Sequence, residues 1–248
     1  MMAMLADTLA KAAGAVLDLA FPRLCPLCGG ASDRSRRLVC WQCFARLPLH
    51  TLDDAICRLC GRVPEGRVEG EFLCDVCRWS HPAFDLARTA APFRGDVRAL
   101  LHSFKYNSAT WLRDDLTDLL DGALRSYYDR EQIDLVLPVP LHVSKLRKRS
   151  YNQAALLAAE LAHRCGLEMR TDCLQRQWPT STQTRLSAQA RRQNVRGAFC
   201  VTQPAWVRGR TVLLVDDVMT TGATLHEAAR SLKAADAWRV WVLAVARG

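Results

Sequence analysis

The chain has 248 residues, of which 50% are apolar and 24% charged, and its formal net charge is +9. This balance is typical of a folded globular protein, and Gly 13 with Pro 10 excludes a collagen-like or low-complexity chain. No stretch approaches the ~20 consecutive apolar residues that a membrane-spanning helix needs. We therefore expect a cytoplasmic protein, and the abnormal feature of its composition is the count of 11 cysteines.

The first 22 residues predict an amphipathic helix. Their apolar side chains recur at helical spacing, at Leu5, Leu9, Ala12, Val16 and Leu19. Charged residues interrupt the segment, at Asp7, Lys11 and Asp18, whereas a secretory signal peptide has an uninterrupted apolar core. We therefore interpret residues 1–22 as a helix of the mature protein.

Eight cysteines form four Cys-x-x-Cys pairs, which are Cys25/Cys28, Cys40/Cys43, Cys57/Cys60 and Cys74/Cys77. In a reducing compartment this spacing is typical of tetrahedral zinc rather than of disulfides. The pattern repeats, with eleven residues between the first two pairs and thirteen between the last two. We expect a double zinc ribbon over residues 23–82 with two structural Zn²⁺ sites. Tandem pairing of neighbouring pairs fits the repeat best, and a cross-braced pairing stays open.

From residue 83 onward, strand and helix patterns alternate. Apolar runs predict strands over 84–93, 133–137, 211–215 and 239–245, and helical spacing predicts helices over 95–105, 111–128, 152–165 and 223–235. Alternating strands and helices form parallel sheets with helices on both faces. We therefore expect an α/β domain over residues 83–248, with a doubly wound parallel sheet.

The segment TVLLVDDVMTTGATL, residues 211–225, predicts a binding site. An apolar strand leads to Asp216 and Asp217, and a turn rich in hydroxyls and glycine precedes a helix. Backbone N–H groups at such a turn and the positive end of the helix dipole bind phosphate. Adjacent carboxylates suit vicinal ribose hydroxyls, so the segment predicts a ribose 5-phosphate site. The alternatives are a nucleotide-hydrolase metal strand, for which the chain lacks the G-x-x-x-x-G-K-[ST] loop, and a plain polar turn.

Positive charge gathers between residues 141 and 196, where eleven Lys and Arg face three acids, a net of +8. Such a field favours a phosphorylated small molecule or a nucleic-acid backbone. A solvated basic face is the alternative interpretation.

The 211–225 segment resembles the phosphoribosyl-diphosphate motif of type I phosphoribosyltransferases. Together with four further motifs in the same order, the chain resembles the ComF family. These motifs are LHSFKY at 101–106, PVPL at 138–141, RSYNQ at 149–153, and a segment from QTRLS at 183 to Phe199. The resemblance covers nearly the whole chain, zinc ribbons included. Ser150 stands where the family usually has Gly.

The resemblance implies a Mg²⁺-dependent displacement of diphosphate from phosphoribosyl diphosphate by an unidentified nitrogen acceptor. Asp216 and Asp217 would hold the ribose hydroxyls, and with Lys105 and Arg149 they are the catalytic candidates. The 5-phosphate would lie on Thr220, Thr221, Gly222, Ala223 and Thr224. Val139 and Pro140 would begin the diphosphate loop, with charge from Lys145, Arg147, Lys148 and Arg149. Arg185, Arg191 and Arg192 would lie on a mobile lid.

ComF relatives are associated with DNA uptake during natural transformation. The resemblance therefore also allows a non-catalytic protein that handles single-stranded DNA with the uptake machinery and uses the pocket as a sensor of nucleotide or phosphoribosyl diphosphate. Type I relatives commonly form homodimers. No residue in the sequence is an obvious general base; His102 and His142 are candidates, with a solvent-exposed or packing histidine as the commoner alternative.

Overall fold

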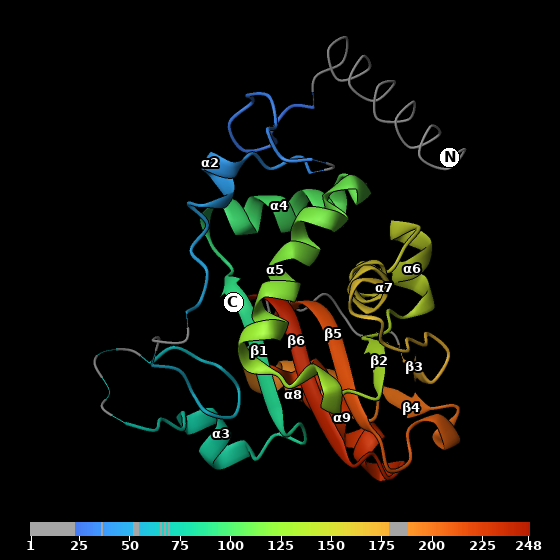
Figure 1. Cartoon of the computed structure of the whole chain (residues 1–248). Helices are drawn as coiled ribbons and strands as arrows, with labels where there is room; N and C mark the ends of the chain where they lie inside the picture. Colours follow the sequence, from blue (N-terminus) through green and yellow to red (C-terminus); the bar gives the residue numbers. More distant parts are fainter. Residues whose placement is uncertain are drawn as a thin grey trace. The chain divides into compact units, whose positions relative to one another are not determined.

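The structure is a computed structural model that describes residues 23–35, 37–51, 55–64, 66, 68, 70–178 and 188–248 (Figure 1). The helix expected over residues 1–22 lies outside these ranges. The chain divides into two compact units, Met1–Leu47 and Pro48–Gly248. The first four of the paired cysteines belong to the first unit. The second four share a unit with the central sheet, and the domain boundary expected after residue 82 stays a prediction.

Both cysteine modules fold in the same way, as the internal repeat predicts. In the first, Cys25 N donates to Gly30 O at 2.7 Å and Gly29 N donates to Cys25 O at 2.8 Å. In the second, Cys57 N donates to Arg62 O and Gly61 N to Cys57 O, both at 2.8 Å. The second Cys-x-x-Cys pair of each module opens a short helix, α2 (Trp41–Phe44) and α3 (Asp75–Ser80).

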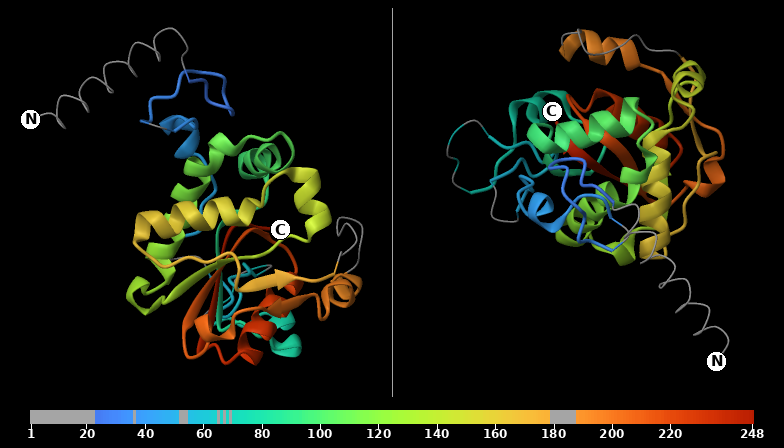
Figure 2. Two further views of the ribbon diagram at one scale, coloured as in Figure 1. Left: turned by 90° about the vertical axis from the view of Figure 1, so that its right-hand side faces the viewer. Right: turned by 90° about the horizontal axis from the view of Figure 1, so that it is seen from above.

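A four-stranded parallel sheet forms the centre of the second unit, in the order β1-β6-β5-β2. Its strands are β1 (Leu86–Pro92), β2 (Leu135–Pro138), β5 (Thr211–Met219) and β6 (Arg239–Arg247). Apolar runs fill the two central strands, because both faces of the sheet are covered. Helices α5 (Arg113–Tyr127) and α7 (Gln153–Cys165) pack on one face, and α9 (Ala223–Ala234) packs on the other (Figures 1 and 2). The expected doubly wound parallel sheet is confirmed.

The connections between the strands of the sheet carry the remaining elements. Helix α4 (Gly95–Tyr106) follows β1, with the 3-10 turn η1 (Thr110–Leu112) before α5, and α6 (Val143–Arg149) follows β2. The turns η2 (Arg130–Gln132) and η4 (Pro204–Trp206) precede β2 and β5. A separate antiparallel pair joins β3 (Leu174–Arg176) to β4 (Phe199–Val201), and α8 (Ala188–Val195) lies between them in sequence.

Strand β5 runs farther than the sequence pattern predicts. It was expected to end at residue 215, but it continues to Met219 because Asp216 pairs with Ala244 and Met219 pairs with Arg247 of the neighbouring β6. Asp216 and Asp217 therefore lie near the end of β5, where the strand is paired with β6 on one side. Among the helices of the described ranges, none has the length and apolarity to cross a bilayer.

Candidate functional site

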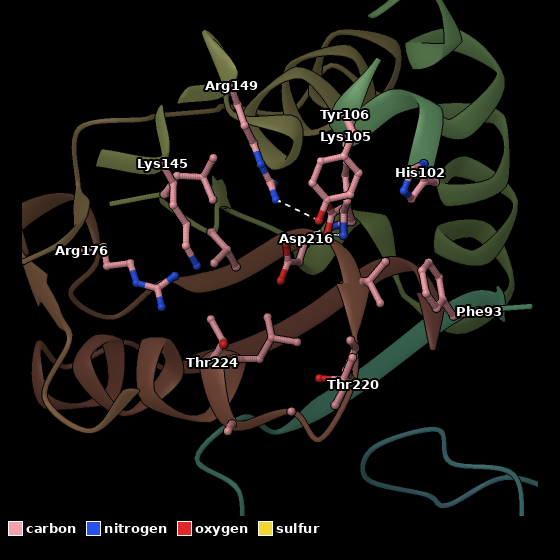
Figure 3. Close-up of a pocket in the computed structure, with 18 of the residues that line it drawn as sticks. Phe93, His102, Lys105, Tyr106, Lys145, Arg149, Arg176, Asp216, Thr220 and Thr224 are labelled. Carbon is pink, nitrogen blue, oxygen red and sulfur yellow. Dashed lines mark hydrogen bonds and ion pairs between the residues drawn. The ribbon is translucent and has the colours of Figure 1, made fainter. Parts of the chain in front are cut away.

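A cavity of about 530 Å³ opens at the carboxyl edge of the sheet (Figure 3). The ends of β1, β2 and β5 contribute to it, and α4 and α6 close its sides. Ligands of open α/β sheets bind at this edge, where the connections of opposite direction diverge. Its described lining holds the cations Arg98, Lys105, Lys145, Arg149 and Arg176 against the acids Asp216 and Asp217. The cavity is therefore suited to an anionic ligand.

The turn between β5 and α9 forms part of the wall of this cavity. Gly222 adopts a left-handed conformation with φ 79°, which allows the chain to reverse directly before the helix. Among the described residues, no acceptor takes the N–H groups of Thr220, Thr221, Gly222 or Thr224. These donors lie at the N-terminus of α9, where the helix dipole attracts negative charge. The turn, which we call the phosphate loop (residues 220–224), has the features of a phosphate receptor.

The two acids of β5 occupy the floor of the cavity in different environments. Asp217 is 7% exposed, and its Oδ1 lies 2.9 Å from Lys105 Nζ at the end of α4. Asp216 accepts a hydrogen bond from Asp217 N at 2.9 Å. Burial, together with the neighbouring Asp217 carboxylate, raises the pKa of Asp216 to about 7. One acid is thus paired with a cation, and the other is left available as an acceptor for a ligand.

Three cations line the cavity on the side opposite to Phe93 and His102, namely Lys145, Arg149 and Arg176 (Figure 3). Burial and the nearby charges of Arg176 and Arg149 lower the pKa of Lys145. Arg149 Nη2 lies 3.3 Å from Tyr106 Oη, and its guanidinium carbon is 5.0 Å from the centroid of that ring. Clustered cations of this kind repel one another until an anion binds between them.

The RSYNQ motif holds the two sides of the cavity together. Asn152 Nδ2 donates to Val139 O at 3.0 Å, which anchors the loop after β2. Tyr151 Oη donates to Phe104 O, and Gln153 Nε2 donates to Lys105 O at 3.4 Å, so that α4 presents Lys105 to Asp217. The motif therefore explains why LHSFKY and PVPL accompany it in sequence.

Ser150 ends α6 in the left-handed conformation, with φ 65°. This is the position in which helices commonly end on glycine, because a side chain there is strained. The Gly that the family usually has at this point is thus explained by backbone geometry. The protein keeps the conformation with a serine, at a cost to its stability.

A mixed aromatic and cationic wall lines the cavity on the side of β1 and α4. It consists of Phe93 after β1 and of Arg98, His102 and Tyr106 on α4. The His102 and Tyr106 rings lie 4.8 Å apart, tilted by 46°. Such rings offer stacking surfaces to a planar ligand. His142 does not line this cavity, because its Nδ1 accepts from Ser144 N and so caps α6.

The structure gathers most of the predicted site residues in this cavity, but it places Thr221 and Pro140 elsewhere, and Arg147 and Lys148 do not line the cavity. Lys105, Arg149, Val139 and both acids line it, as do Thr220, Gly222, Ala223 and Thr224. Thr221 lines a cavity on the other side of the phosphate loop, and Pro140 lines a groove beside α6. Arg185 lies outside the described residues, and so do the side chains of Arg191 and Arg192.

Sequence reasoning did not single out Arg176, Arg98 or Phe93. Arg176 was counted only as part of the basic stretch, because nothing in sequence shows that β3 ends at the cavity. Phe93 follows β1 directly, so its place at the carboxyl edge could have been inferred from the strand prediction.

The cysteines form two groups, one in each unit. They are Cys25, Cys28, Cys40 and Cys43, and Cys57, Cys60, Cys74 and Cys77, with the sulfurs of each group within 4.8 Å of one another. Four sulfurs at the Zn–S distance of about 2.3 Å lie about 3.8 Å apart in a tetrahedron. The observed Sγ–Sγ distances of 3.7 Å, for Cys28–Cys40 and for Cys60–Cys74, fit this value. The tandem pairing is therefore confirmed, and the cross-braced one is wrong.

Backbone donors support the sulfurs in both groups. Cys40 N lies 3.5 Å from Cys25 Sγ, and Cys74 N lies 3.4 Å from Cys57 Sγ. Hydrogen bonds of this kind orient thiolate ligands. Cys28 is exposed, whereas the other seven paired cysteines are buried. The residues fit two structural zinc ions that have no open coordination position for a substrate.

Comparison with known proteins agrees with this geometry. The model of the phosphoribosyl transferase domain matches residues 122–247, and that of the double zinc ribbon domain matches residues 16–79. The DNA utilization protein YhgH of Escherichia coli (strain K12) is 30% identical over 223 residues, which cover 83% of this chain and 96% of the relative. Competence protein F of Haemophilus influenzae is 33% identical over 177 residues, which cover 69% of this chain and 77% of the relative.

Among solved structures, the glutamine phosphoribosylpyrophosphate amidotransferase from B. subtilis, complexed with ADP and GMP, is 21% identical. The match covers 53% of this chain and 25% of that one, with a TM-score of 0.36. The family assignment depends on the two domain models and on the sequence relatives, which span the cysteine groups as well as the sheet.

Proposed function

Because the chain belongs to the ComF family, with a phosphoribosyltransferase domain behind a double zinc ribbon, we propose that it binds phosphoribosyl diphosphate and transfers the phosphoribosyl group to a nitrogen acceptor. The observation that carries this proposal is the pairing of free N–H donors on the phosphate loop with two carboxylates at the end of the same strand. The donors suit the 5-phosphate, and the carboxylates suit the vicinal hydroxyls of the ribose.

The remaining residues have roles that follow from their charges. Lys105 holds Asp217 in place, so that the carboxylate meets the ribose in a fixed orientation. Lys145, Arg149 and Arg176 lie together beside Asp216, where they suit the diphosphate. Positioning and charge stabilisation of this kind are the main demands of displacement at an anomeric carbon.

The donor set also fits Mg²⁺. This ion takes oxygen ligands, usually one or two carboxylates together with substrate phosphates. Asp216 and Asp217, with the substrate's own oxygens, supply such a set, and Mg²⁺ held there neutralises charge on the leaving diphosphate. The aromatic and cationic wall of Phe93, Arg98, His102 and Tyr106 suits a planar nitrogen acceptor on the opposite side of the ribose.

Calorimetry with phosphoribosyl diphosphate and Mg²⁺ tests the binding. We expect saturable binding by the wild type and its loss in a variant that carries Asp216→Asn and Asp217→Asn. Asp236→Asn is the matched control, since Asp236 is exposed and its carboxylate makes a 3.5 Å ion pair with Arg208, outside the cavity. Equal binding by the double variant and the control would remove the proposed role of the two acids. Screening nitrogen compounds for diphosphate release then identifies the acceptor.

A second function is favoured by the surface of α6. This helix carries Lys145, Arg147, Lys148 and Arg149 without an acid, and Trp178 beside Arg176 is 62% exposed. Cations and an exposed indole suit single-stranded DNA, and two relatives are named for DNA utilization and competence. Under this alternative the pocket is a sensor. Affinity for an oligonucleotide should then fall steeply with salt, and a flat salt dependence contradicts this partner.

A further inference from the structure

A second cavity, of about 270 Å³, lies on the reverse side of the phosphate loop. Thr221, Gly222 and Ala223 form part of its wall, and Cys60 and Cys77 of the second cysteine group form another part. Gly222 and Ala223 also line the main cavity. The phosphate loop is therefore a thin partition with the ligand cavity before it and the second cysteine group behind it.

Arg247 connects the two sides of this rear cavity. It stands at the end of β6, in register with Met219 of β5, the residue that precedes the phosphate loop. Its Nη1 donates to Cys60 O at 2.6 Å and lies 3.3 Å from Met219 Sδ. One guanidinium group thus contacts both the backbone of a cysteine knuckle and the base of the phosphate loop.

Met219 connects Arg247 to the phosphate loop by packing against Gly222. Its side chain is buried, and its Cε would lie 2.9 Å from a Cβ placed on Gly222. The methyl group therefore packs directly beneath the left-handed residue of the loop, and a displacement of Met219 displaces Gly222. Gly248 N, directly after β6, donates to Met219 O at 3.0 Å. The end of β6 therefore fixes Met219 through its main chain as well as through the contact of its sulfur with Arg247.

The knuckle itself is attached to the sheet and to α9. Ala87 N of β1 donates to Leu59 O at 2.8 Å, and a Cβ on Gly61 would lie 3.0 Å from Ala87 O. After α3, Ala83 N donates to His226 Nδ1 of α9 at 3.0 Å. The second cysteine group is therefore attached both to strand β1 of the sheet and to α9, the helix that follows the phosphate loop.

Arg247 also affects phosphate binding through its charge. Four thiolates around Zn²⁺ leave a net negative charge, which disfavours a phosphate on the other side of the partition. The guanidinium of Arg247 lies between the two and offsets this repulsion. Its loss would affect phosphate binding both by geometry and by charge.

We propose that Arg247 is a positioning residue through which the second cysteine group, when it holds zinc, sets the conformation and the phosphate affinity of the phosphate loop. The proposal extends the proposed function, because it takes the phosphate loop as the 5-phosphate site. The first cysteine group belongs to the other unit and serves as the comparison in the second test.

The first test measures binding of ribose 5-phosphate by calorimetry and zinc content by atomic absorption, on the full-length chain. We expect Arg247→Met to weaken binding roughly tenfold or more, as for the loss of a hydrogen bond to a charged group, with zinc content unchanged. Arg247→Lys should restore part of the affinity. Arg239→Met, at the opposite end of β6, is the control, because the Arg239 side chain donates to the exposed Gln132 Oε1 and contacts neither cysteine group nor phosphate loop in the described part of the chain. Wild-type affinity in Arg247→Met would overturn the proposal.

The second test does not need the ligand. Amide hydrogen exchange of residues 219–224 is compared between Cys77→Ser and Cys43→Ser, which remove the last cysteine of the second and the first group. We expect faster exchange in the phosphate loop of Cys77→Ser alone. Equal exchange in the two variants overturns the proposal. If the wild type binds no ribose 5-phosphate while this difference is seen, the proposed function fails and the coupling stands.

Discussion

Gly222→Ala offers a direct test of the phosphate loop, since Gly209→Ala provides a control with the same backbone cost. Gly222 has φ 79° and Gly209 has φ 70°, so both lie in the left-handed region. A Cβ on Gly209 meets nothing within 4 Å, whereas one on Gly222 meets Met219 Cε at 2.9 Å. The two substitutions thus share the strain and differ in the contact.

The magnitudes follow from these distances. A non-glycine residue in the left-handed region costs about 1–2 kcal/mol. Alanine also reduces the freedom of the unfolded chain, which offsets about 0.4–1 kcal/mol of that cost. We expect Gly209→Ala to lower the free energy of unfolding by about 1 kcal/mol. Gly222→Ala should lose a further amount of up to about 1 kcal/mol, because the end of the flexible but buried Met219 side chain must move aside.

Urea unfolding and calorimetry with ribose 5-phosphate measure the two effects. Gly209→Ala should bind the ligand as the wild type does. Gly222→Ala should bind at least about tenfold more weakly, since the added methyl group moves the loop that presents the N–H donors. The reasoning is refuted if Gly222→Ala retains wild-type affinity, or if it is no less stable than Gly209→Ala.

Three further outcomes are expected. Ser150→Gly should raise the free energy of unfolding by about 0.5 kcal/mol, visible as a higher Tm, because it relieves the left-handed serine; an unchanged or lower Tm contradicts this. Burial beside Asp217 raises the pKa of Asp216 from 3.8 to about 7, so the ligand-free protein should lose stability as the pH rises from about 4 to 7. Ligand binding uses the ionised carboxylate and should therefore strengthen towards pH 7. Asp216→Asn should flatten the pH dependence of the urea midpoint. Atomic absorption should find two zinc ions per chain, and Cys43→Ser should retain about one; a single ion in the wild type would mean that one cysteine group is empty.

The sequence was sufficient to predict the elements that carry strong periodic or motif signals. The four strands of the parallel sheet, α4, α5, α7 and α9 were all expected, and their bounds differ by a few residues. The repeat of Cys-x-x-Cys pairs likewise predicted the two cysteine groups. In each case a local pattern, apolar periodicity or ligand spacing, is enough to determine the structure.

Elements that depend on tertiary contacts were not predicted. Helix α6 has no buried residue and lies between a proline-rich turn and Ser150, so it has no apolar face to detect. Strands β3 and β4 have three residues each and are defined by pairing with one another. Similarly, β5 extends past its apolar run because β6 supplies partners for Asp216 and Met219.

The same limit applies to the site. The sequence identified Asp216, Asp217 and the phosphate loop, because they are contiguous. It did not show that Lys105 pairs with Asp217, that Arg176 reaches the cavity, or that Thr221 faces the rear one. Each of these depends on how segments far apart in sequence meet at the edge of the sheet.

The unequal exposure of the two cysteine groups has a kinetic consequence. Cys28 is accessible to solvent, whereas every sulfur ligand of the second group is buried. A chelator or a thiol-specific reagent can begin ligand exchange at Cys28 without any opening of the chain, but it must wait for local unfolding before it reaches the other ion. Metal release should accordingly be biphasic. The fast phase comes from the cysteine group of the first unit, and the rate of the slow phase measures local opening of the second unit around its buried cysteines.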